Sequence, residues 1–337
     1  MTPTQQAGQL LMAALQPGPA TGLDPYISGQ GLGSMLYLGG WKDSGTVRAA
    51  SDHLQQASPT IDGTTIGMLI AADQEGGEVQ QLTGSGFTQI PTGLEQAQDP
   101  NLRGSATTWG TELAKAGVNV NLAPVADTVP SDVGTANAPI GQYSREYGST
   151  PQAASAGAVA FARGMQDAGV EPTVKHFPGI GRITGNTDVT AEGTSDEVAT
   201  TKDPHLAPFA DTIESGTKIV MVGSARYPKI DGDTPALFSE KIVDGMLRED
   251  LDFDGVVITD DVGAAKAVAA TPVGERATTF VDAGGDIVLT AAPDQVPTMV
   301  EALTTKATQD KAFATKMNAS VTRVLTLKED MGLLRCH

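Results

Sequence analysis

Residues 151–177 have the sequence PQAASAGAVAFARGMQDAGVEPTVKHF, in which a helical segment, a glycine and a short apolar segment follow one another directly. Residues 151–169 have helical periodicity and capping residues. Gly169 suits the left-handed conformation that commonly ends a helix. The apolar run at 170–177 has the length of a buried strand. The stretch therefore predicts a helix that leads straight into a β-strand.

Short apolar runs of this kind recur along the whole chain. Helical stretches at 99–117 and 239–251 also lie between runs, and Gly117 and Gly216 precede a run as Gly169 does. Eight strands alternating with helices over residues 1–337 predict an α/β fold, a single-domain (β/α)8 barrel of the TIM type. The eight runs are LLMAAL (10–15), SMLYLG (34–39), IGMLIAAD (66–73), VNVNLAPVAD (118–127), VEPTVKHF (170–177), KIVMVGSA (218–225), GVVITDD (255–261) and DIVLTAA (286–292).

An open, doubly wound sheet is the rival fold, and it would carry a glycine-rich phosphate loop after its first strand. The segment LLMAALQPGPATG, residues 10–22, has no G-x-G-x-x-G, and PGIGRITG at 178–185 has the wrong glycine spacing. The sequence therefore favours the barrel and predicts no nucleotide cofactor.

Charge and composition narrow the range of partners. The chain has 22 Lys and Arg against 40 Asp and Glu, a formal net charge of −18, which disfavours nucleic acid and anionic membrane surfaces as partners. No apolar run approaches the length of a membrane span, and the first residues do not resemble a signal peptide. As written, the chain is expected in the cytoplasm, and an exported form with its leader removed is the alternative. The single Cys336 precludes an internal disulfide, and the oligomeric state stays open.

Polar residues stand at the ends of several predicted strands. In a barrel these ends face the same rim, where such folds place their chemistry. Any one of these polar residues, taken alone, can also be explained as a cap of the following helix. The four histidines show no metal-ligand spacing, and there is no G-x-S-x-G motif. Carboxylates with a Lys-His pair suit glycoside hydrolysis. The strand ends are Asp73-Gln74-Glu75, Asp127, Lys175-His176, Ser224 and Asp260-Asp261.

Several segments resemble, in order, the single-domain bacterial β-N-acetylhexosaminidases of glycoside hydrolase family 3. KHFPGIG at 175–181 is similar to the family signature K-H-F-P-G-H-G. The other matching segments are AADQEGGEVQQL (71–82), GFTQIP (86–91), GVNVNLAPVAD (117–127), REYGSTP (145–151), YPKIDGDTPALFS (227–239) and LDFDGVVITDDVGAAKA (251–267).

The resemblance implies a retaining mechanism with Asp260 as the nucleophile. A carboxylate suits that role because it is anionic at neutral pH and can form and then release a glycosyl ester. Asp261 is the structural alternative, as a cap of the next helix. The resemblance also implies that the sugar is bound by four further residues, Asp73, Arg145, Lys175 and His176. A buried ion pair of Lys175-His176 with Asp127 is the other interpretation of that pair. No cofactor or metal is implied.

The acid/base is where the sequence departs from the family pattern. The position of the family's catalytic histidine falls on Thr190, whose hydroxyl cannot exchange a proton near neutrality. Asp188 is the candidate acid/base, and an Asx turn or helix cap is its equally open structural interpretation. Gln81, Glu78 and Ser224 also replace more basic residues of the pattern. The loop GIGRITGNTD, residues 179–188, is closer to an exported lipoprotein branch of the family.

These observations predict an exo-acting glycosidase that releases terminal β-linked N-acetylglucosamine from small glycosides or cell-wall fragments, as in cell-wall recycling. Two alternatives remain. One is a catalytically impaired sugar-binding relative, which Thr190 and Gln81 favour. The other is a β-glucosidase, because barrels of this family accept several sugars.

Overall fold

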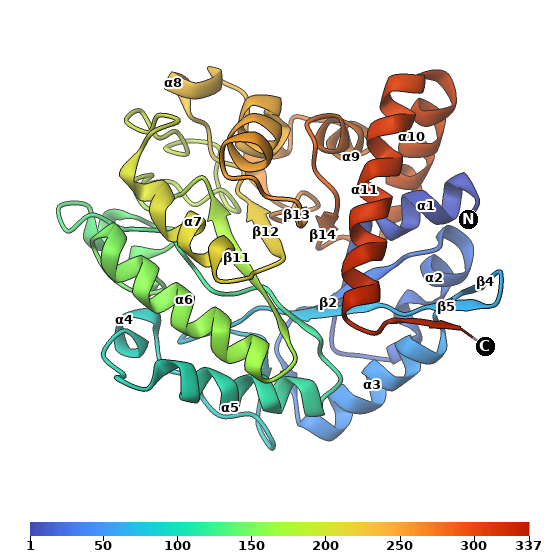
Figure 1. Ribbon diagram of the computed structural model, residues 1–337, viewed down its shortest axis with the longest axis horizontal. Helices are drawn as coiled ribbons and strands as arrows, with labels where there is room; N and C mark the ends of the chain where they lie inside the picture. Colours follow the sequence, from blue (N-terminus) through green and yellow to red (C-terminus); the bar gives the residue numbers. More distant parts are fainter. Residues whose placement is uncertain (337) are drawn as a thin grey trace.

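Eight parallel strands form the centre of the molecule in a computed structural model that describes residues 1–336 (Figure 1). Neighbouring strands pair in chain order from β1 to β13, and β14 pairs with β1. A parallel bridge between Ile258 and Ile287 brings the two remaining edges together. The strands are β1 (Leu11–Leu15), β2 (Ser34–Tyr37), β6 (Leu69–Ala72), β10 (Val120–Asn121), β11 (Glu171–Phe177), β12 (Ile219–Val222), β13 (Val256–Thr259) and β14 (Val288–Thr290). The predicted (β/α)8 barrel is confirmed.

Each barrel strand lies within one of the eight apolar runs. Nearly all strand residues are buried, as expected where side chains fill the barrel interior on one side and contact helices on the other. The fourth strand, β10, is shorter than its run. Regular pairing covers Val120 and Asn121. Beyond them, the carbonyl oxygens of Ala123 and Pro124 still accept the N–H groups of Thr173 and Lys175, and a single bridge joins Val125 to Lys175.

Helices surround the barrel (Figure 1). The predicted helices appear as α5, α6 and η6, and the last of these is of the wider π type. Gly117, Gly169 and Gly216 have φ values of 80°, 76° and 101°. The helices are α1 (Pro3–Gln9), α2 (Asp24–Gln30), α3 (Ser44–Gln56), α4 (Gly93–Gln96), α5 (Leu102–Lys115), α6 (Pro151–Asp167), α7 (Ala207–Glu214), α8 (Pro228–Asp231), η6 (Lys241–Asp250), α9 (Val273–Asp282), α10 (Val296–Gln309) and α11 (Lys311–Asp330).

Three small sheets outside the barrel have no counterpart among the predicted strands. Two of them, β3 with β9 and β7 with β8, involve the loops that follow β2 and β6. The third pairs β15 with β5 and β4 close to the C-terminus. Their strands are β3 (Trp41–Lys42), β4 (Thr60–Ile61), β5 (Thr64–Ile66), β7 (Gln74–Gly76), β8 (Val79–Gln80), β9 (Leu82–Thr83) and β15 (Leu334–Cys336). No helix within residues 1–336 combines the length and the apolarity that crossing a membrane requires.

Candidate active site

A cavity of about 270 Å³ is lined by residues from the carboxyl ends of the barrel strands and from the loops that follow them. Asp73 directly follows β6, and Lys175 and His176 lie in β11. Asp260 directly follows β13, whereas Arg145 and Asp188 lie in the loops after β10 and β11. The structure thus brings together in one cavity lining all six site residues predicted from the sequence: Asp73, Arg145, Lys175, His176, Asp188 and Asp260.

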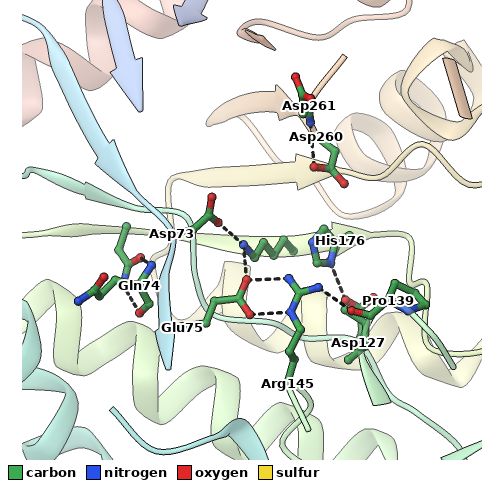
Figure 2. A network of polar contacts seen from close by, with 12 residues as sticks. Asp73, Gln74, Glu75, Asp127, Pro139, Arg145, His176, Asp260 and Asp261 are labelled. Carbon is green, nitrogen blue, oxygen red and sulfur yellow. Dashed lines mark hydrogen bonds and ion pairs between the residues drawn. The ribbon is translucent and has the colours of Figure 1, made fainter. Parts of the chain in front are cut away.

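Glu75 joins the two cations of the site. Nε and Nη2 of Arg145 donate to its two carboxylate oxygens, at 2.8 and 2.7 Å, in a bidentate pair. Nζ of Lys175 lies 2.5 Å from Oε1 of Glu75 and 2.6 Å from Oδ1 of Asp73. Figure 2 shows Asp73, Glu75 and Arg145 in this network. Arg145 also donates to the carbonyl oxygen of Pro139, which fixes the loop after β10.

Burial and ion pairing act in opposite directions on the ionisation of this network. Burial alone would favour neutral Glu75, but Arg145 and Lys175 outweigh it and lower the pKa of Glu75 to about 2. Burial likewise opposes the charge of Lys175, yet Asp73 and Glu75 raise the pKa of Lys175 above its usual value. Both groups are therefore charged at neutral pH. The ammonium has three N–H donors, of which these two carboxylates take two.

Asp127 orients the imidazole ring of His176. The ring Nδ1 lies 2.7 Å from Oδ2 of Asp127, which is fully buried (Figure 2). Asp127 also accepts the backbone N–H of His176 and of Ile180, at 3.2 and 2.7 Å. Because a carboxylate can only accept, Nδ1 carries the proton and Nε2 is left for a ligand. Of the Lys175-His176 pair, only His176 contacts Asp127, through a hydrogen bond, since Lys175 pairs with Asp73 and Glu75 instead.

Asp260 and Asp261 have different surroundings although they are adjacent. Asp261 accepts backbone N–H groups from Gly263, Ala264 and Ala291 at 2.7–3.0 Å, and so joins the loops after β13 and β14. Oδ1 of Asp260 accepts the N–H of Asp261 at 2.8 Å (Figure 2). Burial, with a contribution from Asp260, raises the pKa of Asp261 in spite of its three hydrogen bonds. Asp261 therefore has a structural role, but it does not cap the next helix: the N-cap residues of the following 3-10 helix (Lys266–Val268) and of α9 are Ala265 and Pro272.

Asp188 stands at the exposed side of the cavity, in the loop after β11. Surrounding protein partly desolvates its carboxyl, and the negative charge of Asp260 adds to this effect, so the pKa of Asp188 rises to about 6. Solvent access moderates this shift. The Asx turn considered for this residue exists, but Asn186 makes it by accepting the N–H of Asp188 at 3.0 Å. The carboxyl of Asp188 is not part of that turn.

Other residues highlighted in the sequence lie outside the cavity lining. Oγ1 of Thr190 accepts the N–H of Glu192 at 2.9 Å in a local turn. Gln81 holds the turn after β2, because its side-chain oxygen accepts the N–H groups of Gly39 and Gly40. Ser224 is buried. The sequence places Glu75 at a predicted strand end but does not predict its role as the partner of both cations. Its position two residues after Asp73 was the available signal.

No group of three or more His, Cys, Asp or Glu side chains among residues 1–336 is arranged to hold a metal ion. The two carboxylates Asp188 and Asp260, the paired cations and the oriented imidazole are instead suited to binding a polyhydroxylated ligand and transferring a glycosyl group.

Known proteins share both the sequence and the fold. The family model described as glycosyl hydrolase family 3 N terminal domain matches residues 4–327. A β-hexosaminidase of Methylococcus capsulatus is 35% identical over 243 residues, which cover 70% of each chain. A β-hexosaminidase of Xanthomonas axonopodis pv. citri is 32% identical over 245 residues, which cover 70% of this chain and 71% of the relative. The crystal structure of a β-N-acetylhexosaminidase from Beutenbergia cavernae superimposes with a TM-score of 0.94 at 41% identity, covering 98% of this chain and 99% of the other. The chain therefore belongs to glycosyl hydrolase family 3.

Proposed function

We propose that this single (β/α)8 unit is a retaining exo-glycosidase that releases terminal β-linked N-acetylglucosamine from small glycosides or cell-wall fragments. The observation that carries the proposal is that two carboxylates with different surroundings, Asp260 and Asp188, line one cavity with a set of sugar-binding side chains. The names of the family relatives support the choice of sugar.

In this mechanism Asp260 attacks the anomeric carbon and forms a glycosyl ester. Its assignment over Asp261 is supported by the hydrogen bonds, since Asp261 is occupied by three backbone N–H groups whereas Asp260 accepts one. Asp188 gives its proton to the leaving oxygen and then removes one from the incoming water. A pKa near 6 suits a group that both donates and accepts.

The sugar-binding roles of Asp73, Arg145, Lys175 and His176 are supported by their contacts. Asp73 and Lys175 form a carboxylate–ammonium pair that can contact neighbouring hydroxyls from two sides. Glu75 and Asp127 fix the cations and the imidazole beforehand, so that little conformational entropy is lost when the sugar binds.

The test is hydrolysis of 4-nitrophenyl N-acetyl-β-glucosaminide by the wild type, Asp260→Ala and Asp188→Ala, with the exposed Asp250→Ala as control. Asp260→Ala is expected to abolish turnover. Asp188→Ala is expected to turn over slowly and to be accelerated by azide, because a small anionic nucleophile needs no base in the second step. Unchanged turnover in Asp260→Ala would reject the nucleophile.

The two alternatives are separated by parallel measurements. A sugar-binding relative without catalysis would bind N-acetylglucosamine in calorimetry, in a manner dependent on Asp73, and would cleave none of a panel of aryl glycosides. A β-glucosidase would cleave the plain glucoside faster than its N-acetylated counterpart. The specific observation behind the first alternative is Thr190, whose hydroxyl serves only a local turn.

A further inference from the structure

The loop of residues 182–203, called here the acid/base loop, carries Asp188 and leaves the barrel after β11. An ion-pair network lies at its base. The guanidinium of Arg182 donates from Nη1 and Nη2 to both carboxylate oxygens of Asp203, at 2.8 and 2.9 Å. Nη1 also reaches Oδ2 of Asp196 at 3.3 Å. The first and last residues of the loop are therefore joined by a bidentate pair.

The three charged side chains are largely removed from solvent. The side chain of Arg182 is 18% exposed, and those of Asp196 and Asp203 are 2% and 8% exposed. Each carboxylate also orders the backbone near it. Asp196 accepts the N–H groups of Val198 and Ala199, and Asp203 accepts that of His205. Removing Arg182 would leave two buried carboxylates without their cation, and such a loss disturbs the backbone they organise.

The tip of the acid/base loop is fastened separately. The N–H groups of Thr184 and Gly185 donate to the carbonyl of Gly193, which narrows the loop around residues 186–192. Backbone carbonyls of Thr187 and Asp188 accept the N–H groups of Ala267 and Lys266, at 3.0 and 3.2 Å. Those two donors follow the nucleophile strand β13. The tip thus has backbone hydrogen bonds of its own to this neighbouring loop, while the base determines where the acid/base loop leaves and rejoins the barrel.

We propose that Arg182 is a positioning residue that holds Asp188 where its carboxyl can protonate the glycosidic oxygen of a sugar under attack by Asp260. Arg182 is absent from the cavity lining, so it acts through the loop and not by touching substrate. The inference rests on the proposed function, in which Asp188 is the acid/base. A displacement of a catalytic group by about 1 Å costs roughly 100-fold in rate, so the base of the loop has a direct influence on catalysis.

The dependence of the cleavage rate on the leaving group separates this positioning role from a general structural role. Protonation of the glycosidic oxygen matters most when the leaving group is a poor one, such as an alkyl alcohol, and hardly matters for 2,4-dinitrophenolate. A misplaced Asp188 therefore lowers kcat/KM, which reports the first step, for alkyl and phenyl N-acetyl-β-glucosaminides and spares kcat/KM of the dinitrophenyl substrate. A protein that is only less stable, or less well folded, loses the same factor on every substrate.

The experiment measures kcat and KM of the wild type, Arg182→Lys, Arg182→Met and Asp188→Ala on this substrate series. The expected result for Arg182→Met is a loss in kcat/KM of about 10- to 100-fold on the phenyl substrate, with little change in kcat/KM on the dinitrophenyl substrate. Arg182→Lys keeps the positive charge but cannot form the bidentate pair. Its loss of activity on the phenyl substrate is therefore expected to lie between that of the wild type and that of Arg182→Met. Arg103→Met removes another bidentate pair, the more exposed one with Asp167 that joins α5 and α6, and is the control for loss of such a pair outside the acid/base loop.

Equal losses on all leaving groups, or none, in a folded Arg182 variant overturn the inference. If Arg182→Met does not fold, Arg182→Lys decides by the same criterion. A wild type without turnover would instead refute the proposed function. Leaving-group dependence in Asp188→Ala with wild-type behaviour of both Arg182 variants would refute only the role of Arg182.

Discussion

At the scale of single residues, the carboxylates of the site differ in what they contact. Glu75 is fully engaged by Arg145 and Lys175, and Asp261 by three backbone N–H groups. Asp188 is partly desolvated and faces the negative charge of Asp260, as Asp261 does, but its carboxyl is not held by backbone N–H groups of residues 1–336. Different environments make chemically identical groups suited to different roles.

The raised pKa of Asp188 predicts a pH dependence of catalysis. A general acid must be protonated in the first step, so kcat/KM on a phenyl glycoside is expected to fall as the pH rises through about 6. The measurement is a pH profile of the wild type and Asp188→Asn. The variant should be slow and should lack the basic limb. The same limb in both proteins would assign it to another group.

At the scale of elements, helices α5 and α6 approach each other closely through glycine. A Cβ at Gly164 of α6 would overlap the carbonyl oxygen of Arg103 and the side chain of Ala106, both on α5. By contrast, a Cβ at Gly29 of α2 would meet nothing within 4 Å. The same substitution therefore has opposite consequences in the two helices.

Gly164→Ala is expected to lower the free energy of unfolding by about 1–3 kcal/mol, because overpacking outweighs the better helix propensity of alanine. Gly29→Ala is expected to raise it by about 0.5–1 kcal/mol. Denaturant unfolding of both variants and the wild type measures these differences. Equal changes in the free energy of unfolding at the two sites would show that the close contact of α5 with Gly164 does not destabilise the alanine variant.

At the scale of the whole molecule, the last helix is tied to the first two strands by a buried lysine. Nζ of Lys328 in α11 donates to Oε1 of Gln9 and to the carbonyl of Gly33, at 2.6 and 2.8 Å, just before β1 and β2. Figure 1 shows α11 beside the N-terminal part of the chain. Burial lowers the pKa of Lys328 to about 7.

Lys328 predicts a pH dependence of stability. Between about pH 7 and the usual lysine pKa, the unfolded chain binds a proton that the folded chain does not, so stability rises with pH in this window. Relative to Lys328→Met, the wild type is therefore expected to lose a few kcal/mol in free energy of unfolding as the pH falls from 10 to about 7, and nothing further below.

Denaturant unfolding of the wild type and Lys328→Met across pH 6–10 gives this difference. Lys311→Met, which removes an exposed lysine of the same helix, is the control and should parallel the wild type. Parallel curves for Lys328→Met and the wild type would contradict the prediction.

The sequence by itself determined the barrel and the family. Each strand is a short local run of apolar residues, and burial on both faces imposes that pattern directly on neighbouring residues. The motifs at 71–82, 175–181 and 251–267 likewise contain four of the six predicted site residues that line the cavity, because they lie at the ends of those runs: Asp73, Lys175, His176 and Asp260.

Only the tertiary structure decided which partner each charged group takes. Arg145 and Glu75 are 70 residues apart, and Lys175 and Asp73 are 102 apart. Periodicity contains no information about such pairs, since they depend on how loops from different strands meet at the rim. The pairing of His176 with Asp127, the free carboxyl of Asp188 and the ion pairs of Arg182 all depend on that meeting. Ionisation follows from burial and nearby charge, which exist only once the barrel has closed.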